Sequence, residues 1–419
     1  EEGDAGRAGD DRQDRGAVRD PGRMKIDLLD PASFASGQPH EQFRWLRDHA
    51  PVYRHPEPEG PGFWAVTRYE DVRDVGRDPE HYSSVPTIMI PDFADIDFGD
   101  HQMMITSDPP RHTRLRRIIN SQFTPRAAQE LRARIDELAT LIIDAVIERG
   151  ECDAVTDIAG EMPSFVIAEL LGIPLDDGRR LYHLTESIHA APESVPEGAG
   201  LTAIIEMFNY ARDVAEAKRT APADDLASRI LAAEVDGERL DDIDFNLFFL
   251  LLVDAGGDTT RNLVGGGLVA LFEHPDERRR LQDNLDGKLP TAVDEMLRWV
   301  SPVIYMRRTA TRDCELAGTA IATGDKVVMY YGSANRDERA FTDPDRFDVG
   351  RSPNEQIAFG GGGPHFCLGS HIARIEIQAL LRELLTRLPD IAPTGPAEWL
   401  PSNFISGPKH LPVTFTARA

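Results

Sequence analysis

The stretch from Phe359 to Arg374, FGGGGPHFCLGSHIAR, constrains the fold of this chain more than any other. A single cysteine, Cys367, follows four consecutive glycines and opens a segment whose apolar residues keep helical spacing. These apolar residues are Leu368, Ile372, Ile375, Leu380, Leu381, Leu384, Leu385 and Leu388. Unpaired N–H groups and the positive dipole end at a helix start lower the pKa of a cysteine. The pattern therefore predicts a helix with an exposed thiolate at its start, behind a glycine loop that a large flat ligand can approach.

Three interpretations of Cys367 stay open on these residues alone: a small buried hydrophobe, a tight corner or phosphate loop, and a metal ligand. No Lys-Ser/Thr pair follows the glycines, as a phosphate-binding loop requires. The other two cysteines, Cys152 and Cys314, are single and distant in sequence, which argues against zinc. A lone thiolate that serves one metal favours haem iron.

The longest helical pattern runs from Asp241 to Glu273 and stops at His274-Pro275. Two acids, two glycines and two threonines interrupt its apolar centre at positions 254–260. Glycine weakens a helix by about 0.5–1 kcal/mol relative to alanine, and a threonine hydroxyl can bond back to a carbonyl one turn earlier. Such violations usually mark function, and a kink for packing is the alternative on these residues alone.

Both stretches resemble signatures of the cytochrome P450 family. Six residues look like its haem-binding signature: Phe359, Gly360, Gly363, His365, Cys367 and Gly369. One residue more than the commonest spacing separates Phe359 from Cys367, and a similar expansion occurs in actinobacterial members that act on steroids and branched lipids. Residues 255–260 match the family's oxygen-activation motif. The resemblance covers nearly all of residues 24–419, with four motifs in the family's order.

The resemblance implies the cytochrome P450 fold: mainly α-helical with small β-sheets, shaped as a triangular prism, with haem b (iron protoporphyrin IX) between the long central helix and the cysteine-loop helix. It implies that Cys367 ligates the iron and that Asp258 and Thr259 manage protons, while Ala255 and Gly256 lie beside the cofactor and Gly256 leaves space for dioxygen. The residues that it implies for the haem propionates are His112, Arg116, Arg307 and His365.

His112 and Arg116 lie four residues apart in a basic run behind Asp108-Pro109-Pro110, where Asp108 is expected to cap a helix. Without the resemblance this run is typical of a solvated face. Its neighbours Arg114 and Arg117 are candidates for a basic surface that docks an acidic redox partner.

A second pair, Glu295 and Arg298, has the spacing of a surface ion pair on a helix. In the family these side chains form a buried structural network with the arginine of a Pro-x-Arg-Phe segment, here Arg346. We therefore expect these three residues to be structural.

Asp254 lies one turn before Asp258 on the same helix face, where two like charges repel. Either one of them is protonated, or a cation or a polar substrate group lies between them. We expect Asp254 to line the substrate pocket and to bond a substrate hydroxyl or ketone. The other residues expected in the pocket are Met89, Phe93, Leu251, Val303, Ile304, Phe404 and Ile405.

Asp and Glu number 71 against 46 Lys and Arg, a formal net charge of −25 that argues against a nucleic acid partner. The longest apolar run, Leu247 to Val253, is shorter than the roughly 20 residues of a membrane span, and the charged N-terminus lacks the apolar core of a signal peptide. Three cysteines suit a reducing compartment. We expect a cytoplasmic protein without a membrane anchor, a disordered tail or expression remnant over residues 1–23, and a single domain over residues 24–419.

These expectations lead to a haem-thiolate monooxygenase that hydroxylates a C–H bond of a small hydrophobic steroid, terpenoid or branched lipid with O2. Two electrons would come from ferredoxin and ferredoxin reductase, because no flavin or nicotinamide domain is fused to the chain. The alternatives are tailoring of a polyketide or other secondary metabolite, use of peroxide in place of dioxygen, and a non-catalytic haem-binding module.

Overall fold

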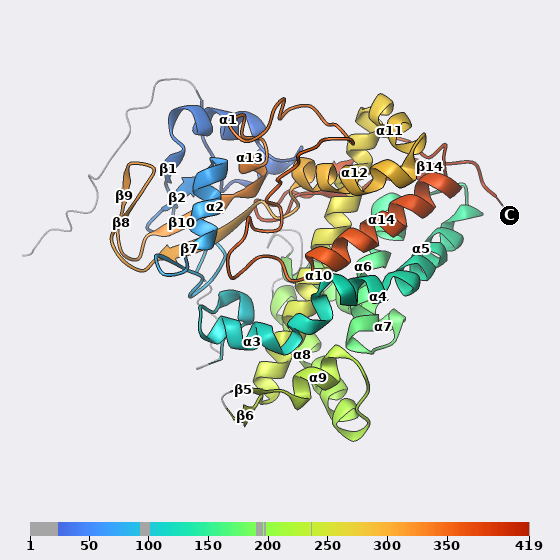
Figure 1. The fold of residues 1–419 in the computed structure, drawn as a ribbon, viewed down its shortest axis with the longest axis horizontal. Coiled ribbons are helices and arrows are strands. Elements are labelled where there is room, and N and C mark those ends of the chain that lie inside the picture. The colour runs from blue at the N-terminus through green and yellow to red at the C-terminus, as the bar shows by residue number, and fades with distance from the viewer. Residues whose placement is uncertain (1–23, 93–100, 190–195, 197, 236, 419) are drawn as a thin grey trace, which may run out of the picture.

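The computed structural model describes residues 24–92, 101–189, 196, 198–235 and 237–418. The expectations for residues 1–23 and for Phe93 lie outside these ranges. In Figure 1 the molecule has a roughly triangular outline, with a sheet at one corner and helices over the rest. The predicted mixture of many helices and small sheets is confirmed.

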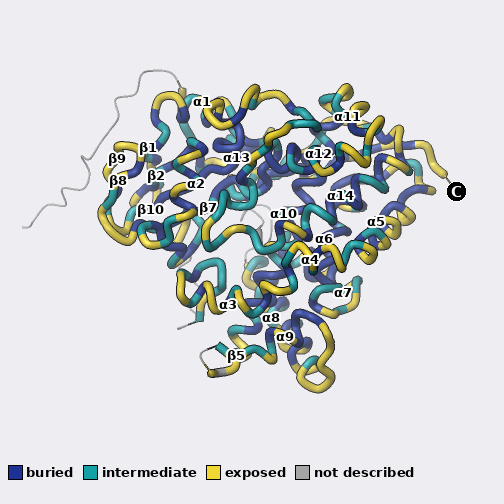
Figure 2. Tube along the Cα trace, in the orientation of Figure 1, coloured by how far each residue is buried: buried dark blue, intermediate teal, exposed yellow. Residues whose placement is uncertain are grey.

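The longest helix, α10 (Asp242–Glu273), crosses the centre of the molecule (Figure 1). Asp241 caps it by accepting hydrogen bonds from the N–H groups of Ile243 and Asp244, and Pro275 follows directly on its C-cap, His274. Leucine, phenylalanine and valine side chains are buried all round this helix, as expected for an element with neighbours on every side. Figure 2 shows α10 as a mostly buried tube.

Other helices pack around α10 and share one large hydrophobic core with it. Those that touch it or each other are α5 (Arg132–Ile147), α6 (Glu161–Leu171), α7 (Leu175–His189), α8 (Ala199–Thr220), α9 (Leu226–Ala232), α11 (Pro275–Gln282), α12 (Leu285–Val300) and α14 (Ser370–Arg387), with the π-helical turn η5 (Ala154–Ala159). The helical pattern predicted behind Cys367 is confirmed as α14, whose apolar side is buried against α5 and α12. The remaining helices are α1 (His40–His49), α2 (Tyr69–Arg77), α3 (Arg111–Ile119), α4 (Pro125–Glu130) and α13 (Tyr331–Ala334).

The main sheet has five strands in the order β1-β2-β10-β7-β3. Their bounds are β1 (Val52–His55), β2 (Phe63–Val66), β3 (Tyr82–Ser83), β7 (Tyr305–Ala310) and β10 (Lys326–Tyr330). β10 pairs in parallel with β2 and antiparallel with β7, where Val327 lies opposite Arg308. This register fixes which arginines of β7 point to each face of the sheet.

Smaller sheets lie at the edges of the molecule. β4 (Glu151–Asp153) joins β11 (Ala392–Pro393) and β14 (Pro412–Thr414), while three pairs are formed by β5 (Glu234–Val235) with β6 (Glu238–Arg239), β8 (Cys314–Leu316) with β9 (Thr319–Ile321), and β12 (Glu398–Trp399) with β13 (Pro408–His410). In the described part of the chain no single helix has the length and hydropathy to cross a bilayer. One pair, 154–171 with 175–188, passes such a test only when taken together across a bend of 117°.

The predicted buried network around Glu295 and Arg298 is confirmed, with one change of partner. Both side chains are fully buried, and Arg298 donates two parallel hydrogen bonds of 2.8 Å to the Glu295 carboxylate. The second guanidinium on Glu295 belongs to Arg351, at 3.0 Å, whereas Arg346 is exposed and contributes its backbone carbonyl to Arg298 and Arg351. The expectation for the Arg346 side chain was wrong because the chain turns after Phe347 and brings Arg351 back to the carboxylate.

Candidate active site

The glycine loop before Cys367 is held against α2 by close backbone contact. All four glycines, 360 to 363, have positive φ angles. At Gly363, where φ is +80°, a Cβ atom would lie 2.2 Å from the carbonyl oxygen of Gly76 at the end of α2. Only glycine fits there, so the loop has one fixed path and places Cys367, whose N–H donates to the Phe359 carbonyl at 2.9 Å.

The prediction that the pKa of Cys367 is lowered overall is wrong for the protein without a bound metal. Burial raises the pKa of this thiol, while the N–H group of Gly369 and the positive charges of Arg116 and Arg374 act in the opposite direction. The N–H group of Ser370, where α14 begins, also lowers the pKa, so the predicted effect of the helix start is present and is outweighed by burial. A cation bound by the sulfur would have to complete its deprotonation.

Two histidines meet beside the cysteine loop. The ring centroids of His112, on α3, and His365 are 4.1 Å apart, and the His365 Nε2 atom is 3.0 Å from the Ser84 hydroxyl. Burial lowers the pKa of His112 to about 4 and that of His365 to about 2, and nearby arginines reinforce both effects. Both rings are therefore neutral near pH 7. Nδ1 of His112 is buried and has no hydrogen-bond partner among the described residues.

Arg308, and not Arg307, joins this histidine pair. The positive charge of Arg308 lowers the pKa values of both His112 and His365, which places its guanidinium beside them. Arg307 points to the other face of the sheet, where its Nη1 atom donates to the carbonyls of Met89 and Ile90 and lies 2.5 Å from Asp92. The expectation for Arg307 was wrong because successive side chains of a strand alternate between faces, and the register of β7 turns the second arginine inward.

Arg116 and Arg308 both place a positive charge near the histidine pair, and neither has a matching carboxylate among the described residues. Arg116 donates to the carbonyl of Pro364 at 3.2 Å and Arg308 to the carbonyl of Arg307 at 2.8 Å. Within the described ranges neither guanidinium makes an ion pair. Asp108, whose charge acts on Arg308, accepts hydrogen bonds from Ser83 and Ser84. Two unpaired guanidinium groups and an orphaned imidazole nitrogen fit an anionic ligand, such as the two propionates of haem.

Asp108 therefore does not cap α3, contrary to the prediction. The helix has Pro110 at its N-cap position and no side-chain cap. Only the backbone carbonyl of Asp108 accepts from the N–H of His112, at 2.9 Å. The side chain is drawn instead to Ser83 and Ser84, which ties the end of β3 to the start of α3.

One side of α10 is open at its centre, although residues 247–253 and 260–268 on either side are buried. Ala255 is exposed, and Gly256 and Thr259 are partly exposed. The Thr259 hydroxyl donates to the Ala255 carbonyl at 3.0 Å, which confirms the predicted bond back to the preceding turn. An apolar helix in the protein core can expose an alanine at its middle only if an open space lies beside that residue. Such a space along this face fits a bound cofactor.

The two acids of this helix differ in their surroundings. Asp258 is buried, and its Oδ1 atom lies 3.9 Å from Nη1 of Arg261 on the same helix. Of the alternatives that the sequence left open for this pair, the structure shows a cation beside Asp258, namely Arg261, a residue that sequence reasoning had not singled out. Its signal was present, because an arginine in the middle of an apolar helix needs a buried partner. Asp254 is half-buried.

The predicted pocket residues divide between open and buried positions. Met89 and Val303 are partly exposed, Leu251 is 7% exposed, and Val303 pairs with Ile405 in an isolated bridge. Ile304 is fully buried in a core cluster with Tyr305 and Val328, so its placement in the pocket was wrong. Phe404 packs edge-on against Tyr305, with ring centroids 5.2 Å apart. Strand alternation explains the division between Val303 and Ile304.

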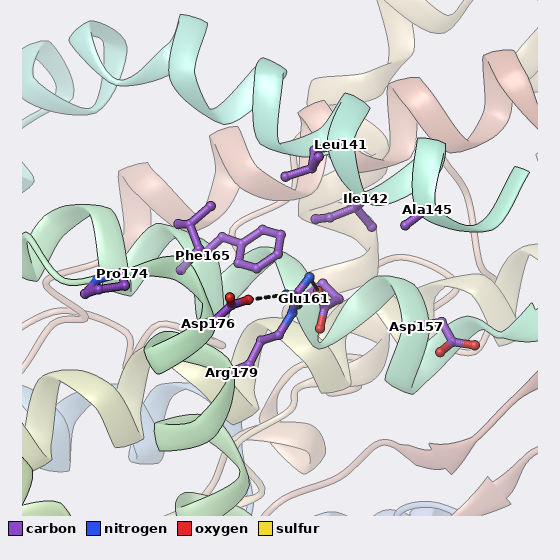
Figure 3. A pocket seen from close by; sticks show the side chains of 10 residues that line it. Leu141, Ile142, Ala145, Asp157, Glu161, Phe165, Pro174, Asp176 and Arg179 are labelled. Atoms are coloured by element: carbon purple, nitrogen blue, oxygen red, sulfur yellow. Dashed lines mark hydrogen bonds and ion pairs between the residues drawn. The ribbon is translucent and has the colours of Figure 1, made fainter.

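Two hollows lie elsewhere on the surface. The first, of about 360 Å³, is lined by residues of α5, α6 and α7, and Figure 3 shows Arg179 within it, between Glu161 and Asp176. These charges pair with one another, at 2.5 and 2.7 Å. The second is lined by Arg114 and Arg117 of α3 and by Arg229 of α9, all of them exposed. Glu234 also lines it, and Arg229 pairs with Asp224 at 2.5 Å. This surface, with three arginines and one acid, is here called the α3–α9 groove.

Three features define the class of this protein: a lone cysteine that can serve as a metal ligand, two arginines and two histidines that suit an anionic ligand, and an acid next to an alcohol on an opened helix. Together they are typical of haem-thiolate enzymes. The family model for cytochrome P450 matches residues 201–389. A methyl-branched lipid omega-hydroxylase of Mycobacterium tuberculosis is 42% identical over 390 residues, which cover 89% of this chain and 90% of that protein. A steroid C26-monooxygenase of the same species is 37% identical over 408 residues, which cover 94% of this chain and 93% of that protein.

Among solved structures, a Mycobacterium marinum cytochrome P450 in complex with pseudoionone has the same fold, with a TM-score of 0.89. Its sequence is 38% identical, and the match covers 96% of this chain and all of that one. This chain belongs to the cytochrome P450 family. It is a monooxygenase, and its cofactor is haem.

Proposed function

We propose that this monooxygenase hydroxylates an aliphatic C–H bond of a steroid, a terpenoid or a branched lipid, with electrons from a ferredoxin and its reductase. The names of the two relatives, a methyl-branched lipid omega-hydroxylase and a steroid C26-monooxygenase, support this substrate class. The observation that carries the reaction type is the set of two arginines without a carboxylate partner, Arg116 and Arg308, around the His112–His365 pair, with Arg116 also acting on Cys367, because it suits a dianionic cofactor next to a single sulfur ligand. The three unpaired cysteines are consistent with work in the cytoplasm.

In this proposal Cys367 ligates the haem iron, and His112, Arg116, Arg308 and His365 hold the propionates. The residues beside the porphyrin are Ala255, Gly256, Phe359, Gly360 and Gly369. Thiolate-ligated haem supplies the activation of O2 that C–H hydroxylation requires. The aromatic ring of Phe359 lies under the guanidinium of Arg374, at 4.6 Å, which fixes the entrance to the cysteine loop.

The proton chemistry falls to Asp258 and Thr259. Asp258 is buried next to a cation, so it can hold a proton or a charge in a place from which bulk water is excluded. The Thr259 hydroxyl rests on the Ala255 carbonyl and has only to turn about its Cα–Cβ bond to offer its proton to the open face of α10. Gly256 keeps that face free of a side chain.

The test is the absorption spectrum of the reduced, haem-loaded protein under carbon monoxide. Thiolate ligation predicts a red-shifted Soret band, and Cys367→Ser is expected to lack it. A normal band with the serine variant would refute the assignment. Spectral-shift titration with steroid, terpenoid, branched-lipid and macrolide panels, followed by product analysis, then identifies the substrate class. A macrolide as the only compound that binds would refute the proposed class.

The α3–α9 groove is the proposed docking site for the ferredoxin. The chain carries a net charge of −25, so an acidic ferredoxin is repelled at long range and needs a local basic surface. Arg114 and Arg117 were predicted to form it, and the fold adds Arg229. The groove lies on α3, the helix whose inner side carries Arg116 beside the cysteine loop, which gives electrons a short path to the haem.

Reversing one charge of this groove tests the docking site. Arg117→Glu is expected to raise the KM for ferredoxin about tenfold at low salt, with little effect at high salt, because charges at an interface rim act mainly on encounter. Lys25→Glu makes the same change of net charge at an exposed site outside the groove. Equal effects of the two variants would show that overall charge, and not this groove, governs the encounter.

A further inference from the structure

A charged cluster joins α7 to α10 next to Asp258. Arg261 follows Asp258 by three residues, and its Nη1 atom is 3.9 Å from Oδ1 of Asp258. The same nitrogen lies 2.5 Å from Oε1 of Glu186 on α7 and also donates to the hydroxyl of Tyr182. One guanidinium nitrogen thus lies between two carboxylates that belong to different helices.

This cluster is partly closed to water. The exposed fractions of the side chains are 5% for Arg261, 12% for Asp258 and 38% for Glu186. The ring of Tyr182 lies 5.5 Å from the guanidinium, and it comes so near to α10 that a Cβ atom on Gly257 would be 3.1 Å from it. In such a place a charge acts more strongly on its neighbours than at a surface, because little solvent screens it.

The charge of Arg261 is retained at neutral pH. Burial lowers the pKa of Arg261 to about 10, and the carboxylate of Asp153 acts against that shift. The cluster therefore sets one cation, Arg261, between two acidic side chains, Asp258 and Glu186. Since one cation cannot fully compensate two carboxylates, whatever strengthens its bond to one of them weakens its hold on the other.

We propose that Arg261 is a shared cation, and that its division between Glu186 and Asp258 sets how firmly Asp258 holds a proton. The inference rests on the proposed role of Asp258 in proton delivery and adds two positioning residues to it. Neither touches the open face of α10 at Ala255 and Thr259. A displacement of α7 relative to α10 changes the distance from Arg261 to Glu186, and so couples the position of α7 to the proton affinity of Asp258.

Other charged groups near the cluster do not replace Arg261. In the described part of the chain, His183 on α7 is 3.0 Å from the second carboxylate oxygen of Glu186, Asp254 precedes Asp258 by one turn, and Asp153 precedes η5. Only His183 can become a cation, and it faces Glu186 from the exposed side of α7. A positive charge on His183 would act in the same sense as removal of the Glu186 charge.

The first experiment measures how kcat for NADPH oxidation depends on pH, with a surrogate ferredoxin and its reductase, in the haem-loaded protein. In Glu186→Gln, Asp258 becomes the only one of the two acids that still pairs with Arg261. We expect the limb of the kcat–pH profile that Asp258 governs to move about one pH unit lower, and the solvent deuterium isotope effect to increase. Arg261→Gln removes the cation and is expected to move the same limb about one unit upward. The opposite signs distinguish a shared cation from a general disturbance of α7.

The matched control is Glu206→Gln. Glu206 on α8 pairs with Arg180 of α7 at 2.5 Å, so this change removes another carboxylate that holds α7 without touching Arg261. It is expected to leave the limb in place. A shift with Glu206→Gln equal to that with Glu186→Gln, or shifts of the same sign for Glu186→Gln and Arg261→Gln, would overturn the inference.

The second experiment needs no turnover. Thermal midpoints are compared for Asp258→Asn in the wild-type and Glu186→Gln proteins, all loaded with haem. If the cation is shared, Asp258→Asn lowers the midpoint more when Glu186 is already neutral, because Arg261 then loses the second of its two paired carboxylates. With Arg261→Gln in the background this difference is expected to vanish. Additive effects while Arg261 is present would contradict the shared cation.

These two experiments also separate the inference from the proposed function. Unchanged pH and isotope effects in Asp258→Asn would refute the proposed role of Asp258 in proton delivery, while the thermal midpoints would still report whether Arg261 is shared. A clear effect of Asp258→Asn together with an unmoved limb in Glu186→Gln would refute the inference alone.

Discussion

Arg307 and Arg308 are consecutive on β7, and their guanidinium groups lie on opposite faces of the main sheet. Arg307 binds Asp92 and the carbonyls of Met89 and Ile90. Arg308 is enclosed near His112 and His365. One residue of register therefore decides which arginine meets the cofactor.

This relationship predicts that Arg308→Gln and Arg307→Gln fail in different ways. Loss of a charge-assisted hydrogen bond costs about 1.5–3 kcal/mol, so Arg308→Gln is expected to weaken haem retention roughly tenfold to a hundredfold. Arg307→Gln is expected to retain haem and to unfold at a lower temperature, since residues 89–92 lose their anchor. The rate of haem transfer to an acceptor globin measures the first effect. Faster loss from Arg307→Gln than from Arg308→Gln would reverse the assignment.

Glu295 is predicted to dominate the stability of the network behind the cysteine loop. Glu295→Gln leaves the buried guanidinium of Arg298 and that of Arg351 without their shared counter-ion, which costs about 3–5 kcal/mol. Arg346→Ala removes an exposed side chain and is expected to change stability by about 0.5 kcal/mol or less. Urea unfolding followed by circular dichroism compares the two. Similar losses would show that the Arg346 side chain does take part.

The two glycines of α10 are predicted to respond differently to alanine. At Gly257 a Cβ atom would lie 3.1 Å from the Tyr182 ring, so Gly257→Ala forces the ring aside and costs about 1–3 kcal/mol. At Gly256 the nearest atom, Cδ1 of Ile167, would be 3.8 Å away, and alanine gains about 0.5–1 kcal/mol of helix stability. Thermal midpoints of the substrate-free proteins are the measurement. A stabilised Gly257→Ala would mean that Tyr182 does not press on the helix.

A buried acid on α14 predicts a pH dependence of stability. Burial raises the pKa of Glu376 to about 8, above the value of about 4.5 in the unfolded chain. The folded state therefore binds more protons between these values, and the stability that Glu376 contributes is complete below about pH 4.5 and is lost as the pH rises through 8. Glu376→Gln stays neutral, so it is expected to be more stable than wild type by about 3 kcal/mol at pH 7 and equal to it near pH 4.5.

Unfolding free energies at several pH values test this prediction. The matched control is Glu383→Gln, since Glu383 lies on the same helix but reaches Arg387 near the surface. A constant difference between Glu376→Gln and wild type across the pH range would show that Glu376 is already ionised in the folded protein.

Local sequence determined the elements that carry the candidate site. The spacing of Leu380, Leu381 and Leu384 specifies α14, and the capping aspartate and the terminal Pro275 delimit α10 within one residue of the prediction. Such signals are reliable because helix periodicity and caps depend on residues a few positions apart. The bond from Thr259 to Ala255 is equally local.

Tertiary structure decided the contacts between distant segments. Strand register and contacts between distant segments decided three pairings in the folded chain. They place Arg308 instead of Arg307 near the histidines, Arg351 instead of Arg346 on Glu295, and Arg261 beside Asp258. The pKa of Cys367 likewise follows from its burial by segments distant in sequence, which no neighbour along the chain reveals. Periodicity is a property of a few consecutive residues, so the sequence alone predicts where helices and strands lie. Burial and charge pairing depend on every segment that packs nearby, so only the folded chain determines which side chains interact.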